Sequence, residues 1–224
     1  MAALLAHGTP SILLLALALL GLIFAILSDH LQIVAKYQGA MRQKIAGGYN
    51  LAMKIMVLNR IGAALYFLII AFNIDRGLSA RTLTLGLSTA ILFVSVPTTY
   101  ILIFLQKRVN RVMSDVQIFD HSMWPKGILL AVFLATSCNL LGLTVPWIAG
   151  AAYPQLRLTL SNTSVLFNAV FTAVNVFYIE HKFAALVDEG NQDLHGFVAG
   201  VMIARLAAFL VVGSLIGMAG GLAQ

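Results

Sequence analysis

Residues 11–35 read SILLLALALLGLIFAILSDHLQIVA, a run whose one charged residue, Asp29, lies toward its end. The hydrocarbon core of a bilayer is about 30 Å thick, and a helix needs about 20 mostly apolar residues to cross it. This stretch meets both requirements of length and polarity. It therefore predicts a membrane-spanning helix.

Five further runs of the same kind follow along the chain. The six predicted spans are residues 11–35, 51–74, 83–105, 127–148, 158–179 and 196–222. Hydrophobic residues make up 60% of the sequence and charged residues 10%, whereas a soluble domain carries about 25% charged residues. The connecting segments are too short to fold as soluble domains. We therefore predict an all-α integral membrane protein, a polytopic bundle of six transmembrane helices in which residues 1–224 form a single transmembrane domain.

The basic residues predict the orientation of this bundle. Loops one, three and five hold eight of them, and loops two and four hold three. The first set is Lys36, Arg42, Lys44, Lys107, Arg108, Arg111, Lys126 and Lys182, and the second is Arg76, Arg81 and Arg157. Because basic loops stay in the cytoplasm, both termini are expected to be extracytoplasmic. The same tendency explains most of the net charge of +6, so no nucleic acid partner is expected.

The third loop is longer than the others and has an amphipathic pattern. Apolar residues such as Val109, Val112 and Val116 alternate with charged residues such as Arg111 and Asp115. This spacing is typical of a helix that lies on the membrane surface. We predict a cytoplasmic interfacial helix over residues 106–124.

The fifth span carries a stripe of polar residues along one helical face. The stripe consists of Ser161, Ser164, Asn168, Thr172 and Asn175, spaced three or four residues apart. In hydrocarbon each of these side chains needs a polar partner. The stripe therefore either holds helices together or faces a substrate, and the sequence leaves both interpretations open.

Three basic residues lie within the spans: Lys54 and Arg60 in the second, and Arg205 in the sixth. A charge at the centre of a helix costs at least about 2.5–3.5 kcal/mol to insert, so such residues usually face the interior of a bundle. Lys54 is close enough to the start of its helix to extend toward the cytoplasmic surface. Arg60 and Arg205 lie deeper, and we expect both to be functional.

The sequence predicts that no carboxylate lies inside a span, because Asp29 and the other acidic residues are assigned to helix ends or loops. The histidines His30, His121, His181 and His195 are assigned to cytoplasmic edges, too scattered to bind a metal. The interior is then cationic and favours an anionic substrate, whose phosphate oxygens arginine binds in a bidentate manner. No enzyme motif is present, so we expect a transporter without a cofactor or metal.

Several segments resemble a known family. Residues 153–168 read YPQLRLTLSNTSVLFN, residues 186–190 read LVDEG, and residues 200–205 read GVMIAR. These segments resemble the fifth helix and the end of the Amj-type lipid II flippases. Residues 36–44 and 58–60 are similar to the family's basic approach to the second helix and to a pair of residues within it.

The resemblance implies a transport function. A member of this family would move an undecaprenyl-pyrophosphate-linked cell-wall precursor, lipid II or a related lipid-linked sugar, from the inner to the outer leaflet of the bacterial cytoplasmic (inner) membrane. Arg60, Arg205 and Lys54 would then bind the pyrophosphate, and the polar stripe would bind the sugars. The expected partners are this lipid-linked anionic substrate and membrane lipids.

Other interpretations of the sequence remain open. The chain could be a non-catalytic scaffold or subunit of a larger membrane complex, or an exporter of small anionic solutes. Assembly into a homo-oligomer and association with cell-wall synthesis enzymes are also compatible with it.

Overall fold

The computed structural model describes residues 12–112, 126–190 and 194–222. All regular secondary structure in these ranges is helical, and six helices are long and apolar enough to cross a membrane. Helices suit this environment because they satisfy their backbone hydrogen bonds internally. The prediction of an all-α, multi-pass membrane protein is confirmed.

The helices follow one another along the chain in a simple order. They are α2 (Ile12–Met41), α3 (Ile45–Asp75), α4 (Ala80–Val112), α5 (Lys126–Ala152) and α8 (Leu194–Leu222), with a composite fifth span between α5 and α8. That span consists of a short 3-10 turn η2 (Pro154–Leu156), α6 (Arg157–Val174), a π-helical segment η3 (Asn175–Glu180) and α7 (His181–Asp188).

The observed helices are longer than the predicted spans. The helix predicted to end at residue 35 continues to Met41, and α3 begins at Ile45 rather than at residue 51. Residues 106–112 continue α4, so they do not begin a separate interfacial helix; the rest of that predicted helix, residues 113–124, lies outside the described residues. Hydropathy marks only the part of a helix that suits hydrocarbon, whereas hydrogen bonding continues into the polar interface.

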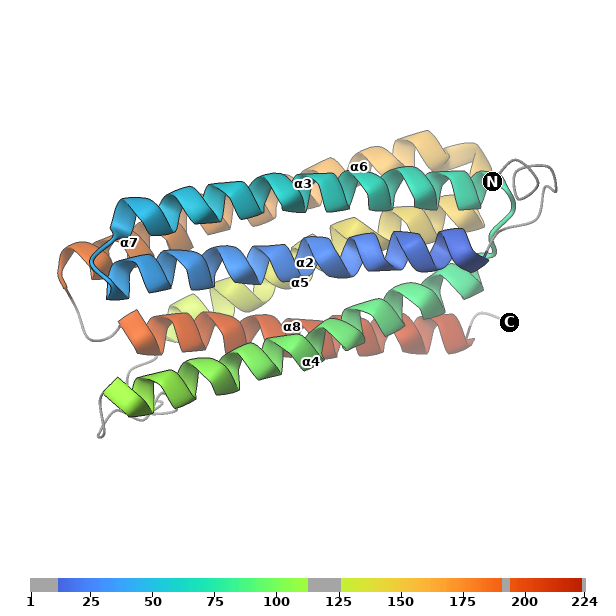
Figure 1. Cartoon of the computed structure of the whole chain (residues 1–224). Coiled ribbons are helices and arrows are strands. Elements are labelled where there is room, and N and C mark those ends of the chain that lie inside the picture. Colours follow the sequence, from blue (N-terminus) through green and yellow to red (C-terminus); the bar gives the residue numbers. More distant parts are fainter. Residues whose placement is uncertain (1–11, 113–125, 191–193, 223–224) are drawn as a thin grey trace.

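Successive spans run in opposite directions (Figure 1). The α2–α3 turn, α7 and the start of α8 lie at one end of the bundle, which we call the α2–α3 end. The α3–α4 turn lies at the opposite end, the α3–α4 end, together with the first residue of α2 and the last residue of α8. Because the number of spans is even, the first residue of α2 and the last residue of α8 lie at the same end. Which end faces the cytoplasm remains a prediction.

The helices pack in three layers. Helices α4 and α8 pack closely together, α2 and α5 lie against them, and α3 and α6 cover α2 and α5 respectively (Figure 1). The core forms two apolar clusters. One contains Leu22, Tyr66 and Phe209, and the other contains Phe197 and Met202. A layer of polar residues lies between these clusters, near the middle of the helices.

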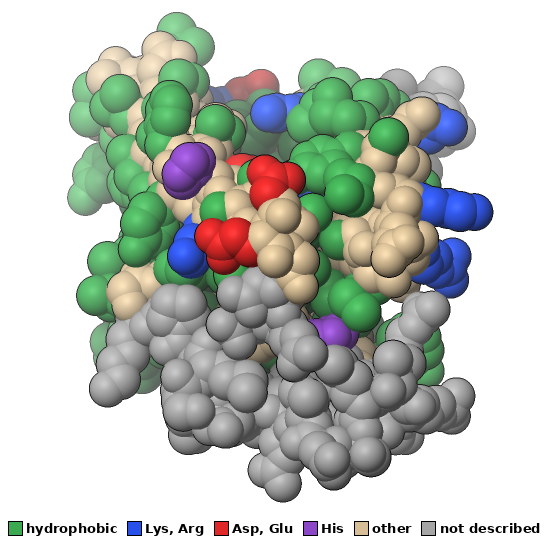
Figure 2. All heavy atoms as spheres, turned by 90° about the vertical axis from the view of Figure 1, so that its left-hand side faces the viewer, with side chains coloured by type: hydrophobic (Ala, Val, Ile, Leu, Met, Phe, Trp, Pro, Cys, Tyr) green, Lys and Arg blue, Asp and Glu red, His purple; other side chains and the backbone are tan. Residues whose placement is uncertain are grey.

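Charged side chains gather on the α2–α3 end, as Figure 2 shows. Its exposed residues include Lys44, His181, Lys182, Asp188 and Glu189. Both signs of charge are therefore present where the bundle meets water or lipid headgroups.

A glycine pair allows α2 and α3 to approach closely near their turn. A Cβ atom on Gly39 would lie 2.6 Å from the Cα of Gly48, and one on Gly48 would lie 2.7 Å from the Cα of Gly39. Small residues at such contacts let membrane helices pack backbone against backbone. By contrast, a Cβ on the neighbouring Gly47 would meet nothing closer than 3.9 Å.

We expect Gly48→Ala to destabilise the bundle, because its methyl group would clash with the backbone of α2. The melting temperature of the purified protein in detergent should fall by several degrees, as expected for overpacking that costs about 1–3 kcal/mol. Gly47→Ala is the matched control and should melt like the wild type. Equal melting temperatures for the two variants would contradict the close contact.

The predicted orientation can be tested with single cysteines in a Cys138→Ala background. We expect a membrane-impermeant maleimide to label Ala152→Cys, at the exposed end of α5, in intact cells. Gly47→Cys lies at the opposite end and should be labelled only after permeabilisation, because its basic loop is retained in the cytoplasm. The reverse pattern of labelling would show that the bundle is inverted.

Candidate functional site

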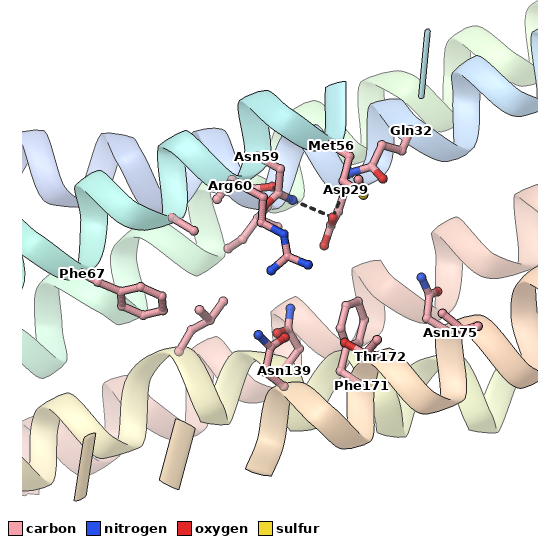
Figure 3. A pocket seen from close by; sticks show the side chains of 16 residues that line it. Asp29, Gln32, Met56, Asn59, Arg60, Phe67, Asn139, Phe171, Thr172 and Asn175 are labelled. Carbon is pink, nitrogen blue, oxygen red and sulfur yellow. Dashed lines mark hydrogen bonds between the residues drawn. The ribbon is translucent and has the colours of Figure 1, made fainter. Parts of the chain in front are cut away.

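A cavity of about 220 Å³ lies between α2, α3, α5 and the composite helix α6–η3 (Figure 3). We call it the central cleft. Polar side chains line both of its walls at mid-height in the bundle. Helices α2 and α3 contribute Asp29, Gln32, Asn59 and Arg60, and the opposite wall contributes Asn139, Asn168, Thr172 and Asn175.

The carboxylate of Asp29 is held in place by two amide groups. Asn59 donates from Nδ2 to Asp29 Oδ1 at 2.6 Å and to the carbonyl oxygen of Ala25 at 3.0 Å. Gln32 donates from Nε2 to the same Oδ1 at 3.2 Å. Asn59 therefore links α3 to α2 and positions the carboxylate toward the cleft.

Arg60 projects into the central cleft from α3. Figure 3 shows its guanidinium group in the space between the two walls. Its side chain is exposed, and within the described residues no hydrogen bond or ion pair engages it. The guanidinium is thus available to a ligand, and its planar donors match phosphate or carboxylate oxygens.

A second arginine lies deeper, beside a small pocket that adjoins the cleft. This pocket is lined by Asp29, His30, Asn139 and Arg205, among others. Arg205 is 3% exposed, and its buried Nε has no hydrogen-bond partner. Asp29 interacts electrostatically with both Arg205 and Arg60, but no direct ion pair joins it to either arginine in the described part of the chain.

The wall formed by α6 and η3 presents unengaged amide and hydroxyl groups. Within the described residues, the side chains of Asn168, Thr172 and Asn175 make no hydrogen bond, and Asn175 Oδ1 is buried without a partner. The π-helical segment begins at Asn175. Such segments are frequent at functional sites because the extra residue per turn redirects side chains.

The central cleft continues onto the outer surface of α6. A groove of about 520 Å³, the α6 groove, shares Asn168, Thr172 and Val176 with the cleft. Its other residues are Val165, Ala169, Ala173 and Phe177. The polar cleft therefore adjoins a mostly apolar surface of α6 and η3 across these three shared side chains.

Five of the eight residues singled out by the sequence lie at this site. Arg60, Asn168, Thr172 and Asn175 line the central cleft, and Arg205 lines the adjoining pocket. Lys54 is exposed and lines neither.

The remaining two residues of the polar stripe do not line the site either. Ser161 donates to the carbonyl oxygen of Leu158 at 3.0 Å, and Ser164 donates to that of Ser161 at 2.7 Å. These bonds lie within α6, so each hydroxyl has a hydrogen-bond acceptor in its own helix and needs neither a partner helix nor a ligand.

Two predictions about α2 are wrong. Asp29 lies inside the helix rather than at its end, so a carboxylate is present in the membrane interior. His30 is 1% exposed, bonded to the Ile26 carbonyl oxygen at 2.9 Å, and does not lie at an edge. The predicted span ended at residue 35, so Asp29 was placed too close to a helix end. The apolar residues that follow Asp29 in the sequence could have shown that the helix continues.

Two ion pairs join the helices of the two walls toward the ends of the bundle. Arg157, at the start of α6, pairs with Asp75, at the end of α3. At the α2–α3 end, Lys36 Nζ lies 2.5 Å from Glu180 Oε1, and so joins α2 to η3. The Lys36 ammonium also lies 5.2 Å from the ring centre of Tyr49. The two walls of the cleft are thus tied together above and below it.

The chemistry of the site suits an anion with additional polar groups. Arginine and amide donors predominate, with Asp29 as an acceptor. In the described ranges, no group of three or more His, Cys, Asp or Glu residues could hold a metal ion. No family model, curated protein or solved structure matches the chain.

A charge swap tests the ion pair at the α2–α3 end. Lys36→Glu and Glu180→Lys each place two like charges in contact, and we expect each to lower the melting temperature in detergent by a few degrees, consistent with a partly buried pair worth about 1 kcal/mol. The double variant restores opposite charges and should recover most of the loss. A double variant that melts as low as the single ones would show that the pair does not join the two walls.

Proposed function

We propose that this protein translocates an anionic lipid across the bacterial cytoplasmic membrane, and that its substrate is a polyprenyl-diphosphate-linked cell-wall precursor such as lipid II. The observation that supports this most directly is that the central cleft and the α6 groove lie next to each other and share Asn168, Thr172 and Val176. A polar, cationic site beside an apolar groove matches a molecule with a charged headgroup and a hydrocarbon tail.

The diphosphate would bind between the two arginines. Arg60 is unengaged in the cleft, and Arg205 is buried beside it with an unpartnered Nε. A buried cation is costly, and an anionic ligand compensates that cost. Charge-assisted hydrogen bonds of this kind contribute about 1.5–3 kcal/mol each.

The prenyl tail would remain on the outer surface of the bundle. The α6 groove offers Val165, Ala169, Ala173 and Phe177, whose side chains match isoprene units in polarity. The tail therefore never has to leave an apolar environment while the headgroup crosses. This division of the substrate lowers the barrier to crossing, because only the headgroup needs a polar path.

The size of the cleft limits what this conformation can hold. Its volume of about 220 Å³ is below the roughly 300–1,000 Å³ of ordinary ligand sites. A diphosphate fits, but a sugar-bearing headgroup requires α3 and α6 to move apart. The ion pairs Lys36–Glu180 and Arg157–Asp75 are the contacts that such a movement would break.

The small cleft also favours a second candidate, export of a small anionic solute. That function would use Arg60 and Arg205 in the same way but would not need the α6 groove. A scaffold that packs against another membrane protein through the polar stripe would also use Asn168, Thr172 and Asn175, which form no hydrogen bond to another helix in the described residues.

The proposal predicts that Arg60→Ala and Arg205→Ala each reduce translocation about tenfold or more, because each removes a charge-assisted contact to the headgroup. The assay is the appearance of a lipid-linked precursor in the outer leaflet of cells depleted of their own flippases, measured by its cleavage with an externally added enzyme. Lys54→Ala is the matched control, since Lys54 is a cation on α3 outside the cleft, and it should retain activity.

Each variant must first be shown to insert and to melt like the wild type. Arg205→Gln, which keeps polar donors, serves if the alanine variant is unstable. Wild-type protein that leaves the precursor inside would exclude the flippase, and uptake of free anions into proteoliposomes would then support the solute exporter.

A further inference from the structure

Asp29 is a carboxylate within helix α2, inside a candidate membrane span. It lines the central cleft together with Arg60 and the adjoining small pocket together with Arg205, so two guanidinium groups lie near it. Both of its hydrogen bonds, from Asn59 and Gln32, reach Oδ1. Within the described residues Oδ2 accepts no hydrogen bond, and so this oxygen is available to carry a proton.

Few other ionisable groups act on this carboxylate. Helix α3 presents Arg60, and α8 presents Arg205. On α2, His30 lies next to Asp29 and interacts with Arg205. From η3, Glu180 also interacts with Arg205. Helix α5 contributes the uncharged Asn139 to the same small pocket.

We propose that Asp29 is a proton-binding site coupled to the substrate: it takes up one proton from water when an anionic headgroup engages Arg60 and Arg205, and releases it when the headgroup leaves. This inference rests on the proposed function. The bound anion draws the two positive charges to itself and places negative charge beside the carboxylate. In an interior of low dielectric constant, that repulsion favours protonation.

Charge balance gives the same result. A diphosphate diester carries two negative charges, which the two arginines neutralise if Asp29 is uncharged. With Asp29 ionised, the occupied cleft would hold one unpaired negative charge in the middle of the membrane, at a cost of several kcal/mol. Without a ligand, the ionised carboxylate instead offsets part of the charge of the arginines. The proton therefore keeps the occupied cleft electroneutral.

The test measures proton uptake on binding. The probe is farnesyl diphosphate linked to N-acetylglucosamine, a diester whose phosphates stay ionised from about pH 6 to about pH 8. Calorimetry in buffers of different ionisation enthalpy should show up to about one proton taken up per probe bound to the wild type. By reciprocity, binding should weaken by up to about tenfold per unit rise in pH. Asp29→Asn should bind without proton uptake and without pH dependence.

His30→Gln and Glu180→Gln are the matched controls, because they remove the other titratable groups near Arg205. Both should retain proton uptake. If Asp29→Asn keeps the proton uptake of the wild type, the proton site is elsewhere and the inference is overturned. If the wild type binds the probe with no uptake, the inference fails while the proposed function stands. If the probe does not bind at all, both fail.

A measurement on the wild type avoids reliance on a variant that does not fold. Infrared difference spectra recorded with and without the probe should show a new carbonyl band of a protonated carboxylic acid, shifted in heavy water. The absence of this band at saturating probe would overturn the inference.

Discussion

The placement of three charges at mid-height in an apolar bundle constrains the rest of this structure. Asp29, Arg60 and Arg205 lie between the two apolar clusters, where hydrocarbon surrounds the protein. Charges at this depth are stable only with partners, ligands or water. The amide groups of Asn59 and Gln32 are such partners for Asp29, and the central cleft gives Arg60 access to water or a ligand.

The two walls of the cleft are packed differently. Helix α2 is held to α3 by the close Gly39–Gly48 contact and by Asn59, so these two helices act as one unit. Helix α6 has no buried residue, packs mainly on α5 and is interrupted by the π-helical segment. If the cleft widens for a large headgroup, α6 is therefore the wall that moves, and the terminal ion pairs limit its movement.

The site was partly predictable from the sequence. Arg60 and Arg205 were identified because a deeply placed cation is costly wherever it lies, and the stripe of α6 was identified from its spacing. Two of the five residues of that stripe, Ser161 and Ser164, bond to carbonyl groups of their own helix, which periodicity cannot reveal. Asn59 and Asn139 were not assigned to the site, because a single amide in an apolar run gives no sign of which neighbour it faces.

The sequence by itself determined that the protein lies in a membrane, how many spans it has and that cations lie within those spans, because hydrophobicity and insertion cost depend on residue type and local order along the chain. The tertiary structure decided where each helix ends, that Asp29 lies near two arginines, and that the cleft adjoins the α6 groove. These features depend on which helices become neighbours and how they rotate about their axes. Such contacts join residues far apart in sequence, so local pattern cannot specify them.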